Sequence, residues 1–197
     1  MDTLNRLIEA LRCLPGVGPK SAQRMVFHLL HKQRQRGLNL ATCLEQAMNT
    51  IGHCQQCNNY TEFPVCLLCQ DTKRNSQLLC IVESPADVSA IEQSHAFQGY
   101  YFVLMGKISP LDGLGPEDIA LPKLKELVKT KGVQEVILAL SPSVEGQTTS
   151  HFIHQLLRDQ SIHISQLAHG IPSGGELEFL DCNTISNALR NRALLNV

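Results

Sequence analysis

Four cysteines in two closely spaced pairs constrain this chain more than any other feature. Cys54 and Cys57 form one Cys-x2-Cys pair, and Cys66 and Cys69 form a second pair a few residues later. Each pair can form a tight turn that directs two thiolates toward one point, and two such turns complete a tetrahedron around Zn2+. The segment holds few core-forming residues, so the metal would supply folding free energy that burial cannot. The spacing predicts one structural zinc ion per chain.

Reduced structural thiols and two local disulfides are the alternatives to zinc. The N-terminus shows no basic start followed by a long apolar segment, so we find no secretory signal and expect a reducing cytoplasmic setting. That setting disfavours disulfides. The longest apolar runs fall far short of the ~20 residues that span a membrane, so no membrane partner is expected. His53 adjoins the first ligand and is expected to be a bystander, because four thiolates already fill the shell.

Basic residues are concentrated at the N-terminus. The chain has a net charge of -1, but residues 1–36 carry seven Lys or Arg against two acids, a balance of +5 that leaves -6 for the remainder. Such a patch is compatible with contact to phosphate groups. A solvated helix face would explain the charges equally well.

A Pro- and Gly-rich break separates two amphipathic segments in this basic region. Apolar spacing predicts helices over residues 2–13, 19–33 and 39–51. The break resembles the hairpin of a helix-hairpin-helix motif, in which Gly16 and Gly18 let the backbone turn and approach a phosphate. The amides that open the next helix would face that anion, and Lys20 and Arg24 lie four residues apart on one face. A structural turn between two helices is the alternative.

From residue 77, short apolar runs alternate with amphipathic segments. Strands are expected at residues 78–82, 100–105, 133–140 and 162–167, with helices at 86–97, 117–131 and 150–160. This alternation predicts a mostly parallel sheet covered on both faces. The tail is expected to add a strand over residues 174–181 and a short helix from Ser186.

The α/β region resembles a Toprim domain, a sheet fold shared by topoisomerases, primases and some nucleases. Glu83, at the end of the first strand, matches that family's acidic residue. Catalytic members also carry an Asp-x-Asp pair that holds Mg2+, and this chain has Ser141 and Ser143 at the corresponding positions. Glu83 and Glu145 alone make a poor two-carboxylate site. A magnesium-dependent Toprim nuclease or nicking enzyme is therefore the disfavoured alternative, and Glu83 could equally be a solvated loop carboxylate.

The order of these parts resembles the RecR family of bacterial recombination mediators over essentially the whole chain. The most specific segments are residues 14–24, 54–69, 108–116 and 169–178. The resemblance implies an α+β multi-domain fold with a strand and helix tail. The expected parts are a helix-hairpin-helix DNA-binding region (1–53), a four-cysteine zinc finger (54–76), a Toprim domain (77–172) and a C-terminal tail (173–197).

The resemblance also implies a function without catalysis. The family acts with RecO, and in some settings RecF, to load RecA onto gapped or single-stranded DNA coated by single-strand-binding protein. Its subunits form dimers or ring-like tetramers, and it works in the bacterial cytoplasm, associating with the nucleoid when active. Glu83, Asp112 and Glu145 are candidates for a partner-binding surface. The zinc module is expected to fix the angle between hairpin and sheet, and a pure scaffold without DNA binding is a third reading.

Overall fold

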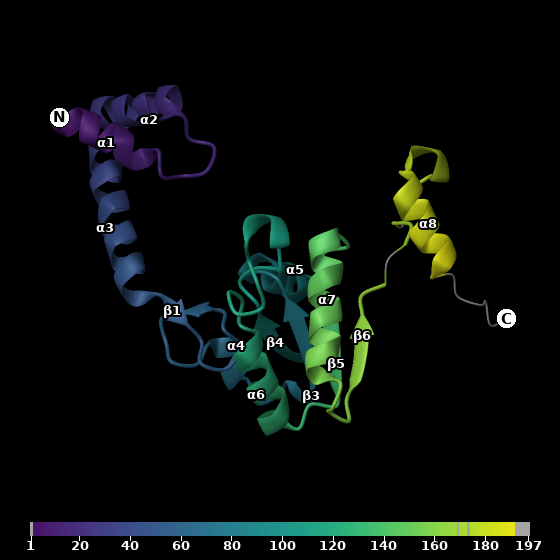
Figure 1. The fold of residues 1–197 in the computed structure, drawn as a ribbon. Helices are drawn as coiled ribbons and strands as arrows, with labels where there is room; N and C mark the ends of the chain where they lie inside the picture. The colour runs from purple at the N-terminus through teal and green to yellow at the C-terminus, as the bar shows by residue number, and fades with distance from the viewer. Residues whose placement is uncertain (1, 169, 173, 192–197) are drawn as a thin grey trace. The chain divides into compact units, whose positions relative to one another are not determined.

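The computed structural model describes residues 2–168, 170–172 and 174–191 (Figure 1). The chain divides into two compact units, Met1–Ile51 and Gly52–Val197. Part of the predicted tail segment 173–197 lies outside the described residues. His169, which belongs to one of the segments that carry the family resemblance, also lies outside them.

The first unit is entirely helical. Its helices are α1 (Thr3–Leu11), α2 (Pro19–Lys32) and α3 (Arg34–Thr50). Asp2 caps α1, because its side chain accepts a hydrogen bond of 2.8 Å from the Asn5 amide. The first two helices match the sequence predictions closely, whereas α3 begins five residues before its predicted start at residue 39.

This unit buries little apolar surface within a single chain. Among its described residues only Ala22 and Val26 are fully buried. A groove of about 450 Å³ runs between the three helices and is lined almost wholly by apolar side chains: Leu7, Leu11, Leu29, Leu30, Leu38, Leu40, Ala41 and Leu44, with Gly37 and Arg34. Exposed apolar surface of this kind marks a place where another molecule packs.

A four-stranded parallel sheet forms the centre of the second unit. Its strands are β3 (Asn75–Val82), β4 (Gly99–Val103), β5 (Glu135–Ala139) and β6 (His163–Gln166), in the order β4-β3-β5-β6. Every neighbouring pair is parallel. The two edges of the sheet are therefore β4 and β6. The alternation of strands and helices predicted this parallel sheet correctly.

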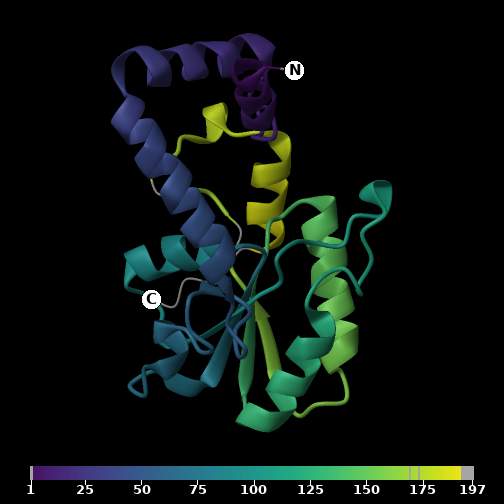
Figure 2. The ribbon, with the colours of Figure 1, turned by 90° about the vertical axis from the view of Figure 1, so that its left-hand side faces the viewer.

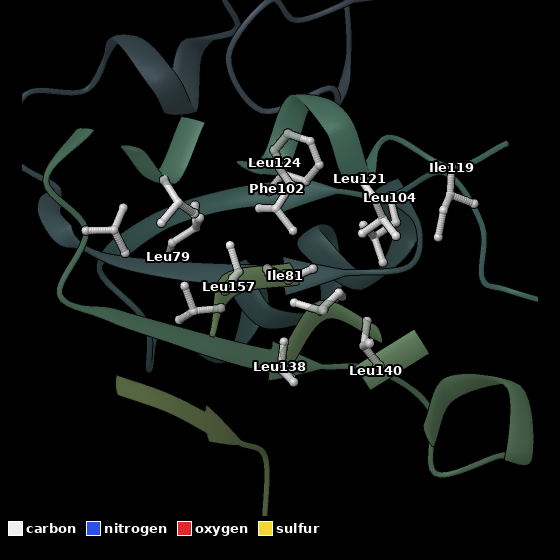
Figure 3. Close-up of a cluster of buried hydrophobic side chains, with 14 of the residues drawn as sticks. Leu79, Ile81, Phe102, Leu104, Ile119, Leu121, Leu124, Leu138, Leu140 and Leu157 are labelled. Atoms are coloured by element: carbon white, nitrogen blue, oxygen red, sulfur yellow. The ribbon is translucent and has the colours of Figure 1, made fainter. Parts of the chain in front are cut away.

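Helices cover both faces of the sheet (Figure 2). On one face, α6 (Leu121–Lys131) and α7 (Val144–Leu157) pack over the larger core, and on the other lies α5 (Pro85–Ser94). Side chains along β3 alternate between the two: Leu79 and Ile81 enter the larger core, whereas Cys80 and Val82 face α5. Figure 3 shows the larger core, with Phe102 from β4 beside Leu124 from α6.

A partly buried ion pair connects the beginning of β3 to α5. The side chain of Arg74 is only 8% exposed and pairs with the Glu92 carboxylate. The same guanidinium donates a 2.9 Å hydrogen bond to the Gly99 carbonyl, and the Tyr101 hydroxyl donates to Glu92 at 2.6 Å. Burial opposes ionisation of Glu92, but the hydrogen bonds from Arg74 and Tyr101 hold its pKa below the usual value.

The short elements lie before β3, between β4 and α6, and at the tail. They are β1 (Gly52–His53), β2 (Tyr60–Thr61), α4 (Leu67–Gln70), the 3-10 turns at Pro110–Asp112 and Leu177–Phe179, and α8 (Cys182–Arg190). The prediction of a strand over residues 174–181 was wrong, since its apolar run forms a 3-10 turn that pairs with no strand in the described part of the chain. The tail helix begins at Cys182, four residues before its predicted start, because Asp181 caps its amides. None of the helices in the described part of the chain has the length and apolar character that a membrane span needs.

Candidate functional site

The four predicted zinc ligands lie together. Their sulfur atoms are all within 4.8 Å of one another, and the Cys57 and Cys66 sulfurs are 3.5 Å apart. A tetrahedral zinc with Zn–S bonds near 2.3 Å needs sulfur separations of about 3.8 Å, so the cluster fits the ion with small adjustments. Cys54, Cys57 and Cys66 are buried. All four positions of the shell are thiolate, which leaves no open position for water or substrate.

Backbone hydrogen bonds hold the first pair of ligands in a tight turn. The Asn58 amide donates to the Cys54 carbonyl at 3.0 Å, and Asn58 takes a left-handed conformation with φ of 62°. The Cys66 amide donates to the Cys54 sulfur at 3.3 Å, which connects the two ligand pairs. His53 contacts the Asn58 carbonyl through Nδ1 at 3.1 Å and lies outside the cysteine cluster, as expected of a bystander.

The thiols influence one another strongly. The hydrogen bond to Cys57 is the main reason that the pKa of Cys66 falls to about 2, and the same contact raises the pKa of Cys57. Several anions this close repel one another, so a cation is needed for all four thiols to ionise. By contrast, burial raises the pKa of Cys80, which is not a ligand, to about 12.

The zinc module is attached to the edge strand β4. The Cys57 carbonyl accepts a 2.9 Å hydrogen bond from the Val103 amide, and the Asn58 side chain donates to the Val103 carbonyl at 2.9 Å. Farther along the same edge, the Arg74 guanidinium donates a hydrogen bond to the Gly99 carbonyl. These contacts tie the module to the sheet, while its predicted effect on the hairpin stays a prediction.

The hairpin predicted from the Pro-Gly break connects α1 and α2. Gly16 has φ of +76°, a conformation that favours glycine, and the Val17 amide closes the turn onto the Leu14 carbonyl at 3.2 Å. Gly18 precedes α2 and offers no side-chain cap, so the first helical amides remain available to an anion.

Lys20 and Arg24 project from the start of this helix. Both are exposed, and the first turn of α2 contains no acidic residue. Within the described residues, neither side chain forms an ion pair. The arrangement can bind phosphate groups through one row of amides and two free cations.

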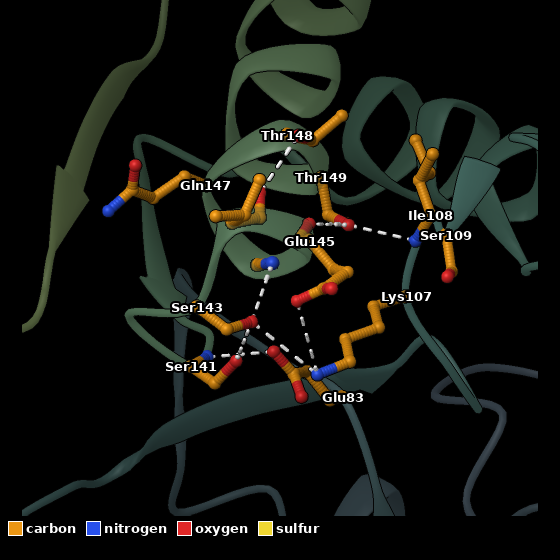
Figure 4. A network of polar contacts seen from close by, with 12 residues as sticks. Glu83, Lys107, Ile108, Ser109, Ser141, Ser143, Glu145, Gln147, Thr148 and Thr149 are labelled. Carbon is orange, nitrogen blue, oxygen red and sulfur yellow. Dashed lines mark hydrogen bonds and ion pairs between the residues drawn. The ribbon is translucent and has the colours of Figure 1, made fainter. Parts of the chain in front are cut away.

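The loops that follow β3 and β5 bring two of the acidic candidates into one network (Figure 4). Glu83 accepts a 2.7 Å hydrogen bond from the Ser141 amide, and the Ser141 and Ser143 hydroxyls are 2.9 Å apart. Lys107 joins them, with its ammonium 3.4 Å from the Ser143 hydroxyl and 4.0 Å from the Glu145 carboxylate. The structure therefore places a lysine ammonium beside the two serines and Glu145.

The electrostatics of this network disfavour metal chemistry. A hydrogen bond from its own backbone amide, followed by the Ser143 hydroxyl and the charge of Lys107, lowers the pKa of Glu145. Both serines are neutral, and the local ammonium repels a second cation. Asp112 does not belong to this network: it accepts a 2.6 Å hydrogen bond from Ser109 in its own 3-10 turn.

Sequence reasoning missed Lys107. Its local signal was a Gly-Lys pair at the end of a strand, which is too short to identify a site. Only the pairing of β4, β3 and β5 brings the loop that carries it to Ser143 and Glu145. The Ile108 amide also donates to Thr149 on α7 at 2.9 Å, which fixes the loop.

Comparison with protein families covers nearly the whole chain. Residues 4–48 match the RecR helix-hairpin-helix model, 51–71 the RecR zinc finger domain with four cysteine ligands, 77–168 a Toprim domain, and 170–193 the RecR C-terminal model. The similar proteins include "Recombination protein RecR" of Legionella pneumophila strain Philadelphia 1, which is 78% identical over 197 residues and covers 100% of this chain and 99% of its own. The chain belongs to the RecR family.

A second relative extends this result. The protein of the same name from Legionella pneumophila strain Corby is 78% identical, with full coverage of both chains. Family membership confirms the predicted helix-hairpin-helix, zinc and Toprim parts of the fold. The RecR zinc finger match and the clustered cysteines together identify a structural zinc site.

Proposed function

We propose that this protein is a DNA-repair recombination mediator that binds DNA without chemically altering it. The observation that carries this proposal is the hairpin, where Lys20 and Arg24 flank uncapped amides at the start of α2. Gly16 and Gly18 allow the close backbone approach that a phosphate requires. Contacts of this kind position a nucleic acid regardless of its sequence. A recombination mediator needs that property at any damaged site.

The network around Glu83 and Glu145 supports a role without catalysis. Ser141 and Ser143 replace the carboxylates that a Toprim enzyme would use, and Lys107 already neutralises Glu145. The site therefore supports a binding role better than magnesium-dependent cleavage.

The proposal includes protein partners. By family resemblance, the protein acts with RecO and RecF to load RecA onto gapped or single-stranded DNA coated by single-strand-binding protein. Glu83 follows β3, Asp112 lies in the 3-10 turn after β4, and Glu145 lies in the first turn of α7 after β5. All three come after the carboxyl ends of strands, where parallel sheets present their binding residues. We keep these three carboxylates as the proposed partner surface. Work on chromosomal DNA would place the protein in the bacterial cytoplasm, at the nucleoid.

The proposal also includes self-assembly into a dimer or a tetrameric ring. The apolar groove between α1, α2 and α3 supports it, because seven leucines are too many to leave against water. Assembly would repeat the basic patch of residues 1–36, so a nearly neutral chain could bind a polyanion. The division at residues 1–53, 54–76, 77–172 and 173–197 stays part of this proposal.

The test of the proposed function is the Lys20→Ala, Arg24→Ala double variant. We expect its affinity for DNA to fall at least roughly tenfold, and the slope of log affinity against log salt to decrease by about two, since each lost duplex phosphate contact removes about 0.9. Fluorescence anisotropy with a labelled gapped duplex, over a salt series, measures both quantities.

A Lys32→Ala, Arg36→Ala variant is the matched control. It removes two exposed charges from the same unit while leaving the hairpin intact. If both variants lost the same affinity for DNA, the contribution of Lys20 and Arg24 would be one of overall charge and not of the hairpin. Unchanged DNA binding in the Lys20→Ala, Arg24→Ala variant would refute the assignment. Cleavage of the labelled DNA in Mg2+ or Mn2+ would contradict the non-catalytic role.

A further inference from the structure

A second concentration of positive charge lies on α6, in the unit that contains the sheet. Residues 52–197 contain ten Lys or Arg and fifteen Asp or Glu, so this part of the chain is acidic overall. Four of those ten cations lie on the eleven residues of α6, against one acid, Glu126: they are Lys123, Lys125, Lys129 and Lys131. A net charge of +3 on one helix of an acidic unit is a local surface feature.

The core fixes which side of α6 faces water. Leu121, Leu124 and Val128 are buried against the sheet, which leaves Lys123, Lys125 and Lys129 exposed on the outer surface. Within the part of the chain that the structure describes, none of the four lysines forms an ion pair. Lys131 differs from the others, since it donates to the Gln56 side chain at 2.5 Å and lies over the Tyr100 ring.

A groove runs along one flank of this helix. It has a volume of about 400 Å³, with Lys123 and Lys131 near its ends, about 12 Å apart along the helix axis. Gln55 and Gln56 of the zinc module line it too, together with Leu127 and Thr130. Amide and hydroxyl groups between two cations provide hydrogen-bond donors for an anionic strand.

We propose that α6 and this groove form a second nucleic-acid surface, which binds the phosphate backbone of a single strand independently of the hairpin. Charge complementarity identifies the ligand. Lys123 lines the groove beside the neutral donors, and Lys125 and Lys129 extend the positive charge over the rest of the exposed surface of the helix, which fits a chain of phosphates. Glu126 also lines the groove, and its negative charge limits the affinity for phosphates. The proposal goes beyond the hairpin assignment and holds or fails separately from it.

The first experiment removes the free charges. In the full-length protein, Lys123→Ala, Lys125→Ala and Lys129→Ala together should weaken binding of a labelled oligothymidine about tenfold at low salt. They should also lower the salt slope by about two, at about 0.7 for each single-strand contact. The corresponding Lys→Arg triple variant keeps the charges and should bind like the parent. Unchanged affinity and slope in the alanine variant would overturn the proposal.

A second experiment changes the affinity in the other direction. Glu126→Gln removes the one acid of the groove and should tighten binding about twofold to threefold. The control Lys73→Ala removes an exposed charge elsewhere in the same unit and should have little effect.

The same variants separate the competing outcomes. If a poly-glutamate peptide loses binding in the α6 variant while oligothymidine does not, the surface belongs to an acidic protein and the proposal is wrong. If the Lys20→Ala, Arg24→Ala variant loses DNA binding and the α6 variant does not, only this second surface is refuted.

Discussion

Replacing Cys57 by serine is expected to abolish stable zinc binding and to lower the melting temperature by roughly 10 °C. The free energy of zinc binding to a structural four-ligand site is about 10–16 kcal/mol, comparable with the whole stability of a domain. Cys57 also presents the carbonyl that accepts from Val103, so loss of the turn disturbs β4 as well. Zinc stoichiometry and calorimetry on the same sample measure the two effects.

Cys80→Ser is the matched control for this change. Cys80 is also buried, at 2% exposure, but lies against α5 and away from the ligand cluster. It should destabilise the fold modestly, as a hydroxyl placed among apolar side chains does, while leaving one zinc per chain. A Cys57→Ser protein that retained full zinc content and the parent melting temperature would refute the structural role.

The second large effect is expected from Arg74→Ala, with a loss of about 3 kcal/mol of unfolding free energy. The substitution leaves the partly buried Glu92 without its cation and the Gly99 carbonyl without its donor. Breaking a buried pair costs about 3–5 kcal/mol, and the 29% exposure of the Glu92 side chain places the result near the lower end. Urea denaturation at neutral pH measures the change.

The pH dependence gives an independent check of Arg74. The pKa of Glu92 is depressed in the folded protein, so its contribution is present above its unfolded pKa and is lost as pH falls through the folded value. The parent protein should therefore lose stability on acidification below about pH 4.5, the usual range for Glu, more steeply than Arg74→Ala does. Arg158→Ala, at an exposed arginine on the same unit, should match the parent in both measurements. Parallel pH curves for the parent and Arg74→Ala would contradict the assigned ion pair.

Local signals were sufficient for much of this fold. The spacing of the Cys-x2-Cys pairs alone was enough to predict the zinc site. Strand β3 was recognisable because Leu79, Ile81 and their neighbours form one apolar run. Helix α2 followed from Pro19 at its start and from the buried positions Ala22 and Val26.

Elements that depend on distant contacts were harder to predict. Helix α7 begins at Val144, six residues before its predicted start, although Gly146 and two threonines are poor helix formers. The glycine is required there because a Cβ would lie 2.0 Å from the Ser141 carbonyl. The tail run at Leu177 had the composition of a strand but pairs with no other strand among the described residues.

Because of the hydrogen bonds between the zinc module and β4, the solubility of this protein should depend on the zinc available to it. On the outer edge of β4, the amide and carbonyl of Val103 are hydrogen-bonded to Cys57 and Asn58, and the Gly99 carbonyl is hydrogen-bonded to Arg74. Without zinc, the turn that presents Cys57 and Asn58 loses its support, and part of this edge is left open to strands of other chains. Zinc starvation would then remove this protein from a cell by aggregation as well as by unfolding.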